Sequence, residues 1–418
     1  VEGTQYTSTK DVVDIAVAGH NIDLQTGYCQ NPGCGADLRV TTSYRVPTYK
    51  TPGVASSGIA SWQTVSDVKA IPLPSSTTPQ TWYSQYYVVQ SGQTVSLSKG
   101  AICAGDVHLI VEDGATLNIN ANAQNNAGIA VSGGSTSLTI YGQTENTGKL
   151  TSISGKYGAC IGGNSNSAGA NITINGADVK AGSNEQYTTG LGGGYKNEGY
   201  NIIINGGNVT ALGRLAAGIG GGYKGEGHDI IINGGNVIAR DTGSGYYGAG
   251  IGGGTEKIGY NITINDGHIT AIGSGGGAGI GGGYQRSGYN ITIAGGIIDA
   301  RGGGSYADGI GNGRYPSGYC DTKNGYIKFG LKVGIMSGST VIDNTYADMF
   351  DVVHKKQYIT THIHDLVYNG NATCTTAGTM SAQCDQCNKT FEFEDPDHPS
   401  LGHNYTNNTL TASPVEDG

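Results

Sequence analysis

The segment Gly218–Ala239, GIGGGYKGEGHDIIINGGNVIA, decides the fold, because near-copies of it follow one another along the middle of the chain. The same order of glycines, isoleucines and asparagines returns at Gly250 (GIGGGTEKIGYNITINDGHITA) and at Gly279 (GIGGGYQRSGYNITIAGGIIDA). Further copies, some of them weaker, start at Cys160, Gly190 and Gly309. Successive starts lie about 28 to 32 residues apart, a period that indicates a repeat architecture.

Each repeat contains three short β-type stretches separated by glycine turns. Because side chains alternate along a strand, Ile202 and Ile204 share one face, opposite Asn201, Ile203 and Asn205. Three strands per turn, stacked turn upon turn, predict an all-β chain folded as a right-handed parallel β-helix with about 30 residues per rung. A propeller is the rival interpretation, but its blades need roughly 40–50 residues and four strands.

Composition shifts divide the chain into five expected parts. A Ser/Thr/Pro-rich stretch with little periodicity precedes the repeat region, and this change marks the boundary between the N-terminal region and the body of the protein. We expect an extended N-terminal region for strand exchange or docking (1–82), the β-helix (83–321), a β cap (322–360), a small Cys/His module (361–406) and a polar tail (407–418).

Composition also limits the function. The 74 glycines argue against a helical bundle, since each interior glycine costs a helix about 1 kcal/mol relative to alanine. Only 23 Lys and Arg stand against 32 Asp and Glu, without a basic cluster, so we expect no nucleic-acid partner. The chain has no apolar run of membrane-spanning length, so we expect no membrane span.

Its polar surface pattern, and a first residue Val1 that suggests a removed leader or a fragment, favour an extracellular or bacterial cell-surface location.

Two stretches resemble known families. The blocks YYVVQSGQTVSL (Tyr86–Leu97), VHLIVEDGATLNI and the recurring AGIGGG…NITINGG pattern resemble a glycine-rich β-helix repeat of secreted or wall-attached proteins of anaerobic bacteria. The resemblance covers about half the chain, Tyr86 to about Gly313, and implies carbohydrate binding by association. The pattern H…ATC…AG…CxxC…GHxY in His364–Tyr405 resembles a short module of surface proteins in the same organisms, although Asn388 stands where that module usually has glycine.

Cysteine and histidine residues form two candidate cross-links, each either a disulfide or a metal site. In the C-terminal module, three thiols and an imidazole suit a closed structural zinc site, with one further histidine as an alternative ligand. The main set is Cys374, Cys384, Cys387 and His403, and the alternative ligand is His364. A disulfide from Cys374 to the CxxC pair is the alternative, and no other cofactor is expected. Near the N-terminus, Cys29 and Cys34 (CQNPGC) are expected to form a disulfide across a Pro-Gly turn, with metal ligation as the alternative.

Tyrosines recur at two positions of the repeat. Tyr195, Tyr223 and Tyr284 follow the GGG run, and Tyr200, Tyr260 and Tyr289 precede the NI dipeptide. Since equivalent positions stack in a β-helix, we expect two ladders of rings. They can form a strip on which sugars stack, or they can stabilise rung stacking and cover glycine-rich backbone. They can equally be buried against a neighbouring copy of the protein.

We therefore expect a non-enzymatic extracellular structural protein that assembles with copies of itself into a surface filament or layer with an adhesive role. The alternative is a carbohydrate-binding adhesin that binds polysaccharide on its tyrosine ladders. A polysaccharide lyase or hydrolase is the third hypothesis. It is disfavoured because the rung charges are sparse and lie in turns. The consecutive glycines of the GIGGG stretch suggest close packing against this backbone, so we expect a partner there.

Overall fold

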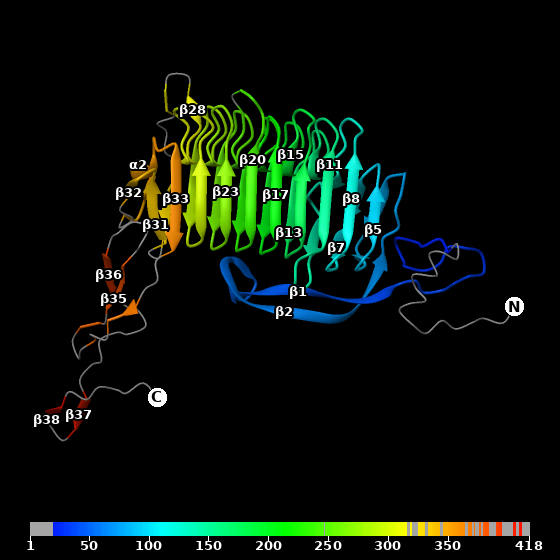
Figure 1. The fold of residues 1–418 in the computed structure, drawn as a ribbon, viewed down its shortest axis with the longest axis horizontal. Helices are drawn as coiled ribbons and strands as arrows, with labels where there is room; N and C mark the ends of the chain where they lie inside the picture. The colour runs from blue at the N-terminus through cyan, green and yellow to red at the C-terminus, as the bar shows by residue number, and fades with distance from the viewer. Residues whose placement is uncertain are drawn as a thin grey trace.

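The computed structural model describes residues 20–245, 247–315, 318–319, 325–330, 333–342, 346–363, 367–369, 372, 376–377, 379–383, 390–394, 404–406 and 409–411. This part of the chain confirms the predicted all-β parallel β-helix with about 30 residues per turn. Within it, the short α2 (Phe350–Val353) is the one α-helix. The strands stack in a row, with the chain advancing from one end of the solenoid to the other (Figure 1).

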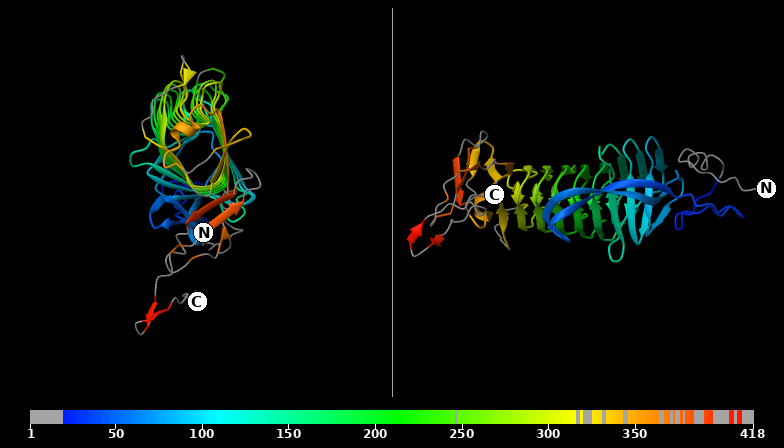
Figure 2. Two further views of the ribbon diagram at one scale, coloured as in Figure 1. Left: turned by 90° about the vertical axis from the view of Figure 1, so that its left-hand side faces the viewer. Right: turned by 90° about the horizontal axis from the view of Figure 1, so that it is seen from below.

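Three sheets form the walls of the solenoid, and successive strands along the chain visit them in turn (Figure 2). The first sheet contains β1 (Val40–Thr51), β2 (Val54–Pro72), β4 (Tyr86–Val89), β7 (Asp106–Val111), β10 (Ser137–Tyr141), β13 (Gly169–Ile174), β16 (Gly199–Ile204), β19 (Gly227–Ile232), β22 (Gly259–Ile264), β25 (Gly288–Ile293) and β30 (Ile327–Phe329). The second sheet contains β5 (Thr94–Leu97), β8 (Thr116–Ala121), β11 (Lys149–Ser154), β14 (Asp178–Gly182), β17 (Asn208–Gly213), β20 (Asn236–Asp241), β23 (His268–Ile272), β26 (Ile297–Arg301), β33 (Tyr358–Ile363), β31 (Val333–Ser337) and β32 (Thr340–Ile342). The third sheet contains β3 (Gln80–Tyr83), β6 (Ala101–Ala104), β9 (Ile129–Ala130), β12 (Ala159–Gly162), β15 (Thr189–Gly192), β18 (Ile219–Gly220), β21 (Ile251–Gly252), β24 (Ile280–Gly281) and β27 (Ile310–Gly311).

Short antiparallel pieces complete the described strands. They are β28 (Arg314–Tyr315) with β29 (Gly318–Tyr319), β34 (Val367–Tyr368) with β35 (Thr379–Gln383) and β36 (Thr390–Glu394), and β37 (Asn404–Thr406) with β38 (Thr409–Thr411).

The core is a set of stacked isoleucine columns. Ile202 pairs in register with Ile230, which pairs with Ile262, so the same side chain lies above itself at each turn. Ile202 and Ile204 are fully buried, while Ile203 is only partly buried, as the alternation predicted. A single rung cannot bury this face, so the core exists only because rungs stack.

The glycine-rich strand approaches its own neighbours rather than a partner. Gly192, Gly220, Gly252 and Gly281 are buried and adopt φ between +125° and +136°. A Cβ on Gly220 would collide with the carbonyl oxygen of Gly252 in the next rung, and the other three have the equivalent neighbour. The expected close packing is therefore real, but the chain's own backbone supplies it.

The N-terminal region contains a long antiparallel hairpin. β1 pairs with β2 from Val40↔Ala70 to Thr51↔Val54, and only the end of β2, at Ile71 and Pro72, joins β4. The hairpin then runs along the outside of the solenoid (Figure 1, blue). Its base is fixed by an apolar cluster in which the ring of Tyr44 lies 4.2 Å from that of Tyr141. Residues 40–72, part of the region expected to be extended and suited to docking, thus fold against the chain's own β-helix.

Both ends of the solenoid core are covered. At the N-terminal end, Ile22 and Leu24 pack against the core, and the hydroxyl of Tyr87 donates a hydrogen bond to the Leu24 carbonyl (2.6 Å). At the other end, β33 pairs antiparallel with β26 and β31 pairs antiparallel with β33. These antiparallel additions end the parallel ladder, which is the usual role of a solenoid cap.

Candidate functional site

A ladder of asparagines marks the edge of the first sheet that faces the hairpin. The amide of Asn205 donates to Oδ1 of Asn175, that of Asn233 to Asn205, and that of Asn265 to Asn233, each at 2.7 Å. An amide carries two donors and an acceptor with two lone pairs. Asn205 and Asn265 use both of their donors, within the ladder and to the hairpin, so they retain acceptor capacity only. The last position of the repeated NI(T/I)I(N/A) motif thus forms a continuous column of hydrogen-bonded amides.

The hairpin lies over this ladder and contacts it directly. The amide of Asn205 donates to the hydroxyl of Tyr49 (3.0 Å), and the amide of Asn265 to the carbonyl of Ser56 (3.1 Å). Gly206 leaves room for Trp62, since a Cβ there would lie 3.1 Å from the indole. These contacts join residues that lie as many as 209 positions apart in the sequence.

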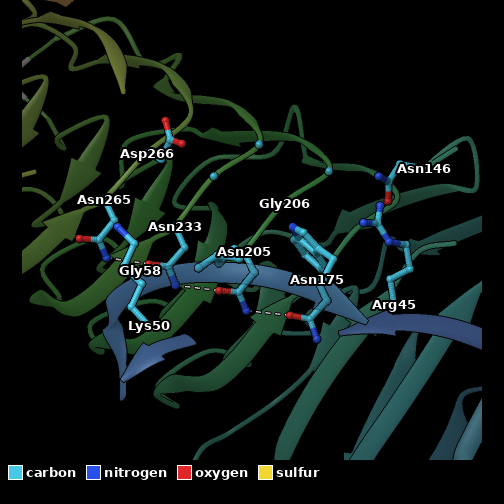
Figure 3. A pocket seen from close by; sticks show the side chains of 15 residues that line it. Arg45, Lys50, Gly58, Asn146, Asn175, Asn205, Gly206, Asn233, Asn265 and Asp266 are labelled. Atoms are coloured by element: carbon cyan, nitrogen blue, oxygen red, sulfur yellow. Dashed lines mark hydrogen bonds between the residues drawn. The ribbon is translucent and has the colours of Figure 1, made fainter. Parts of the chain in front are cut away.

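Between hairpin and solenoid lies a cavity of about 380 Å³, which we call the hairpin groove (Figure 3). It is lined by Arg45, Lys50, Gly58, Ile59, Trp62, Asn146, Asn175, Asn205, Gly206, Gly207, Asn233, Gly234, Gly235, Asn265 and Asp266. The lining combines amides that both donate and accept, one indole, two cations and one carboxylate. Grooves that bind polar ligands typically carry such a small set of oriented polar groups beside an aromatic ring.

The charges of the hairpin groove favour an anion. Arg45 and Lys50 are both supplied by β1, and Asp266 is the one carboxylate among the described lining residues. The guanidinium of Arg45 lies 5.1 Å from the centre of the Trp62 ring. Neither cation takes part in an ion pair within the described chain. Their N–H groups therefore have no carboxylate competing with a ligand.

The ladder that precedes the NI dipeptide is continuous. The ring of Tyr200 stacks on His228 (5.2 Å), His228 on Tyr260 (4.7 Å), and Tyr260 on Tyr289 (5.3 Å), with interplanar angles no larger than 13°. Burial raises the pKa of Tyr260 and Tyr289. Because adjacent rings cover each other's faces, the ladder presents mainly ring edges to a ligand, whereas a stacked sugar needs a ring face.

The ladder that follows the GGG run is less regular. Tyr195 stacks on Tyr223 with ring centres 5.4 Å apart, and two tyrosines outside the repeat position, Tyr157 and Tyr187, pack against this pair. In the next rung Thr255 is buried and its hydroxyl donates to the Leu215 carbonyl (3.1 Å). Tyr284 lies beyond this interruption, two rungs from Tyr223.

The structure brings Cys29 and Cys34 together and adds a histidine that sequence reasoning missed. Both cysteines are free, and each Sγ lies 3.1 Å from Nδ1 of His20. The expected Cys29–Cys34 disulfide is not formed here and stays a prediction. The C-terminal candidates Cys374, Cys384, Cys387, His403 and His364 lie outside the described residues.

Two buried carboxylates outside the hairpin groove are occupied by the fold. Asp241 accepts hydrogen bonds from the backbone N–H groups of Leu215, Gly243 and Gly248 and from the Ser274 hydroxyl. Asp308 accepts from backbone N–H groups and lies 3.0 Å from Nδ1 of His354. Burial raises the pKa of both carboxyls. Their partners show that they hold turns and the C-terminal cap in place.

The fold defines a parallel β-helix protein whose flank carries a hairpin groove. No family model matches the chain, and no curated protein or solved structure matches it either. The resemblance to surface proteins of anaerobic bacteria therefore rests on the sequence motifs alone. None of the helices in the described part of the chain is long and apolar enough to cross a membrane.

Proposed function

We propose that this protein is a non-enzymatic, extracellular β-helix scaffold that binds an acidic polysaccharide in the hairpin groove. The observation that carries the proposal is the placement of two cations without ion pairs, an indole and a ladder of amides along one groove. A sugar carboxylate can accept two hydrogen bonds from Arg45 while the sugar's hydroxyls donate hydrogen bonds to the amide oxygens.

The regular spacing of the amides favours a polymer over a single sugar. Asn175, Asn205, Asn233 and Asn265 repeat once per rung, at the interstrand spacing of about 4.8 Å. A ligand with repeating hydroxyl and carboxylate groups can engage several rungs at once. A compact ligand would contact only one or two of them.

Binding without catalysis is favoured by the arrangement of carboxylates. Glycoside hydrolysis uses a pair of carboxylates on either side of the scissile bond. Asp266 is exposed and has no second carboxylate beside it among the described lining residues. The buried Asp241 and Asp308 have their oxygens engaged elsewhere.

Assembly of copies of this chain stays a prediction, and the structure favours one geometry for it. Because Ile22 and Leu24 cover one end of the core and β33 covers the other, copies are better placed to associate side by side than end to end. Light scattering over a concentration series, with electron microscopy of the product, distinguishes lateral layers, end-to-end filaments and single molecules.

The binding test uses the full chain and a panel of neutral and uronic-acid polysaccharides. We expect binding to the acidic members, weakened about 10-fold or more by Arg45→Ala, because a charge-assisted hydrogen bond contributes about 1.5–3 kcal/mol. Lys50→Ala should act in the same direction, while Lys99→Ala, an exposed lysine outside the hairpin groove, should change nothing. Binding that survives Arg45→Ala and Lys50→Ala but is lost in Tyr195→Ala or Tyr260→Ala would place the site on the tyrosine ladders and refute the proposal.

A further inference from the structure

The segment at the N-terminal end of the solenoid is a small unit with little core of its own. Backbone hydrogen bonds link Asp23 to Tyr28, and Cys29 to Ala36, around a turn containing Pro32 and Gly33. Cys29 and Leu38 are buried within it, while most of its neighbours are partly or fully exposed. Units of this size usually need a disulfide or a metal ion for stability.

Three potential ligands converge in this unit. Nδ1 of His20 and the Sγ atoms of Cys29 and Cys34 all lie within 4.8 Å of one another. Zinc binds thiolate sulfur at about 2.3 Å and imidazole nitrogen at about 2.0–2.1 Å. Three ligand atoms spaced this closely can therefore contact one ion, with small adjustments of rotamer.

The backbone around each sulfur is arranged for a thiolate. Cys29 accepts a hydrogen bond from the Asn31 backbone, and Cys34 accepts one from the Ala36 backbone, each two residues further along the chain. Such N–H donors stabilise a negative sulfur, and hydrogen bonds to the ligands of a metal fix their orientation and adjust their affinity for the ion. A disulfide sulfur carries no such charge and gains little from them.

We propose that His20, Cys29 and Cys34 form a zinc site that fixes the N-terminal segment to the end of the β-helix. Both thiols lose their protons to solvent when the ion binds, and the imidazole binds as the neutral ring through Nδ1. The fourth position of the tetrahedron is left for a water molecule or a further ligand. The segment is tied to the solenoid core through Ile22, Leu24 and the Tyr87 hydroxyl, so the metal would hold the end cap in place.

The test measures zinc bound to the full chain by mass spectrometry after purification without chelator. Since the C-terminal Cys/His residues can also bind metal, the informative quantity is the difference between variants. We expect His20→Ala, Cys29→Ser and Cys34→Ser each to lose about one zinc ion per chain relative to wild type. Cys160→Ala, which removes a buried thiol far along the β-helix, should retain it.

Two further measurements separate zinc from a disulfide. Cobalt added to the metal-free protein should give sulfur-to-cobalt charge-transfer absorption that is weaker in Cys29→Ser than in the wild-type protein. His20→Cys should restore the zinc lost in His20→Ala. His20→Ala is decisive, because a disulfide does not need the imidazole. Unchanged zinc content in His20→Ala, or an intact mass showing a Cys29–Cys34 bond in the native protein, would overturn the proposal.

Discussion

The asparagine ladder should contribute strongly to stability, and Asn205→Ala tests it. The side chain of Asn205 makes three hydrogen bonds, to Asn175 (2.7 Å), from Asn233 (2.7 Å) and to Tyr49 (3.0 Å). It is 1% exposed, and both neighbouring amides are also buried. At about 1 kcal/mol for each hydrogen bond, the substitution should cost about 3 kcal/mol. Partners left without a bond would add to this loss.

The assay combines urea unfolding with hydrogen exchange. We expect a lower unfolding midpoint and faster exchange of the hairpin β1–β2, because Asn205 links the hairpin to the ladder. Asn208→Ala is the matched control, since it removes an exposed amide three residues further along. A loss below about 0.5 kcal/mol, with unchanged exchange in the hairpin, would refute the reasoning because it lies within the range of ordinary surface substitutions.

Three further outcomes are expected. Gly220→Ala should destabilise the protein by about 3 kcal/mol or more, because the added Cβ meets the Gly252 carbonyl at an unfavourable φ. Gly53→Ala, with open space around the added Cβ, should cost only about 1 kcal/mol. Equal losses of stability in the two variants would contradict the packing argument. His228→Ala should lower stability by about 1–2 kcal/mol, because two ring contacts are lost, and His228→Tyr should restore it. Thermal unfolding measures both effects. Unchanged stability in His228→Ala would show that the ladder contributes nothing. Burial lowers the pKa of His362 in the folded state below its ordinary value of 6.5, so the contribution of His362 to stability is fully present above pH 6.5 and is lost as the pH falls through the folded-state pKa. His362→Gln should therefore flatten the acid side of the plot of unfolding free energy against pH. An unaltered plot would count against this assignment.

The repeat alone predicted the β-helix, because the period fixes both the number of strands per rung and the stacking of identical residues. Ile202 and Ile204 were placed in the core from alternation, and Tyr260 and Tyr289 in a ladder from their equivalent positions. The GIGGG strand was correctly expected to be closely packed, but the expectation that a partner packs against it was wrong. The next rung occupies that space, as Gly220 and Gly252 show.

The hairpin groove could not be predicted in the same way. It depends on pairs such as Asn265 with Ser56 that share no sequence motif and lie far apart in the chain. A local signal for the hairpin did exist, since Pro52–Gly53 is a turn dipeptide flanked by β-forming residues. That signal predicts a turn, but it does not say where the hairpin packs.

His20 was missed for a related reason. The CQNPGC spacing pointed to a closed loop around Cys29 and Cys34, and the histidine enters only through the antiparallel bridge between Ile22 and Cys29. Tyr157 and Tyr187 likewise join the Tyr195–Tyr223 stack from positions that the repeat does not mark. Tertiary contacts outside the repeat therefore build both candidate sites.

Hydrogen exchange of the full chain with and without oligomers of galacturonic acid tests the central claim most directly. We predict protection of β1 and β2 and of the turns at Asn205–Gly207 and Asn233–Gly235, which line the hairpin groove. Protection should weaken as salt is added, because Arg45 and Lys50 attract the carboxylates. Protection confined to the tyrosine ladders, or no change anywhere with acidic or neutral oligomers, would contradict the account.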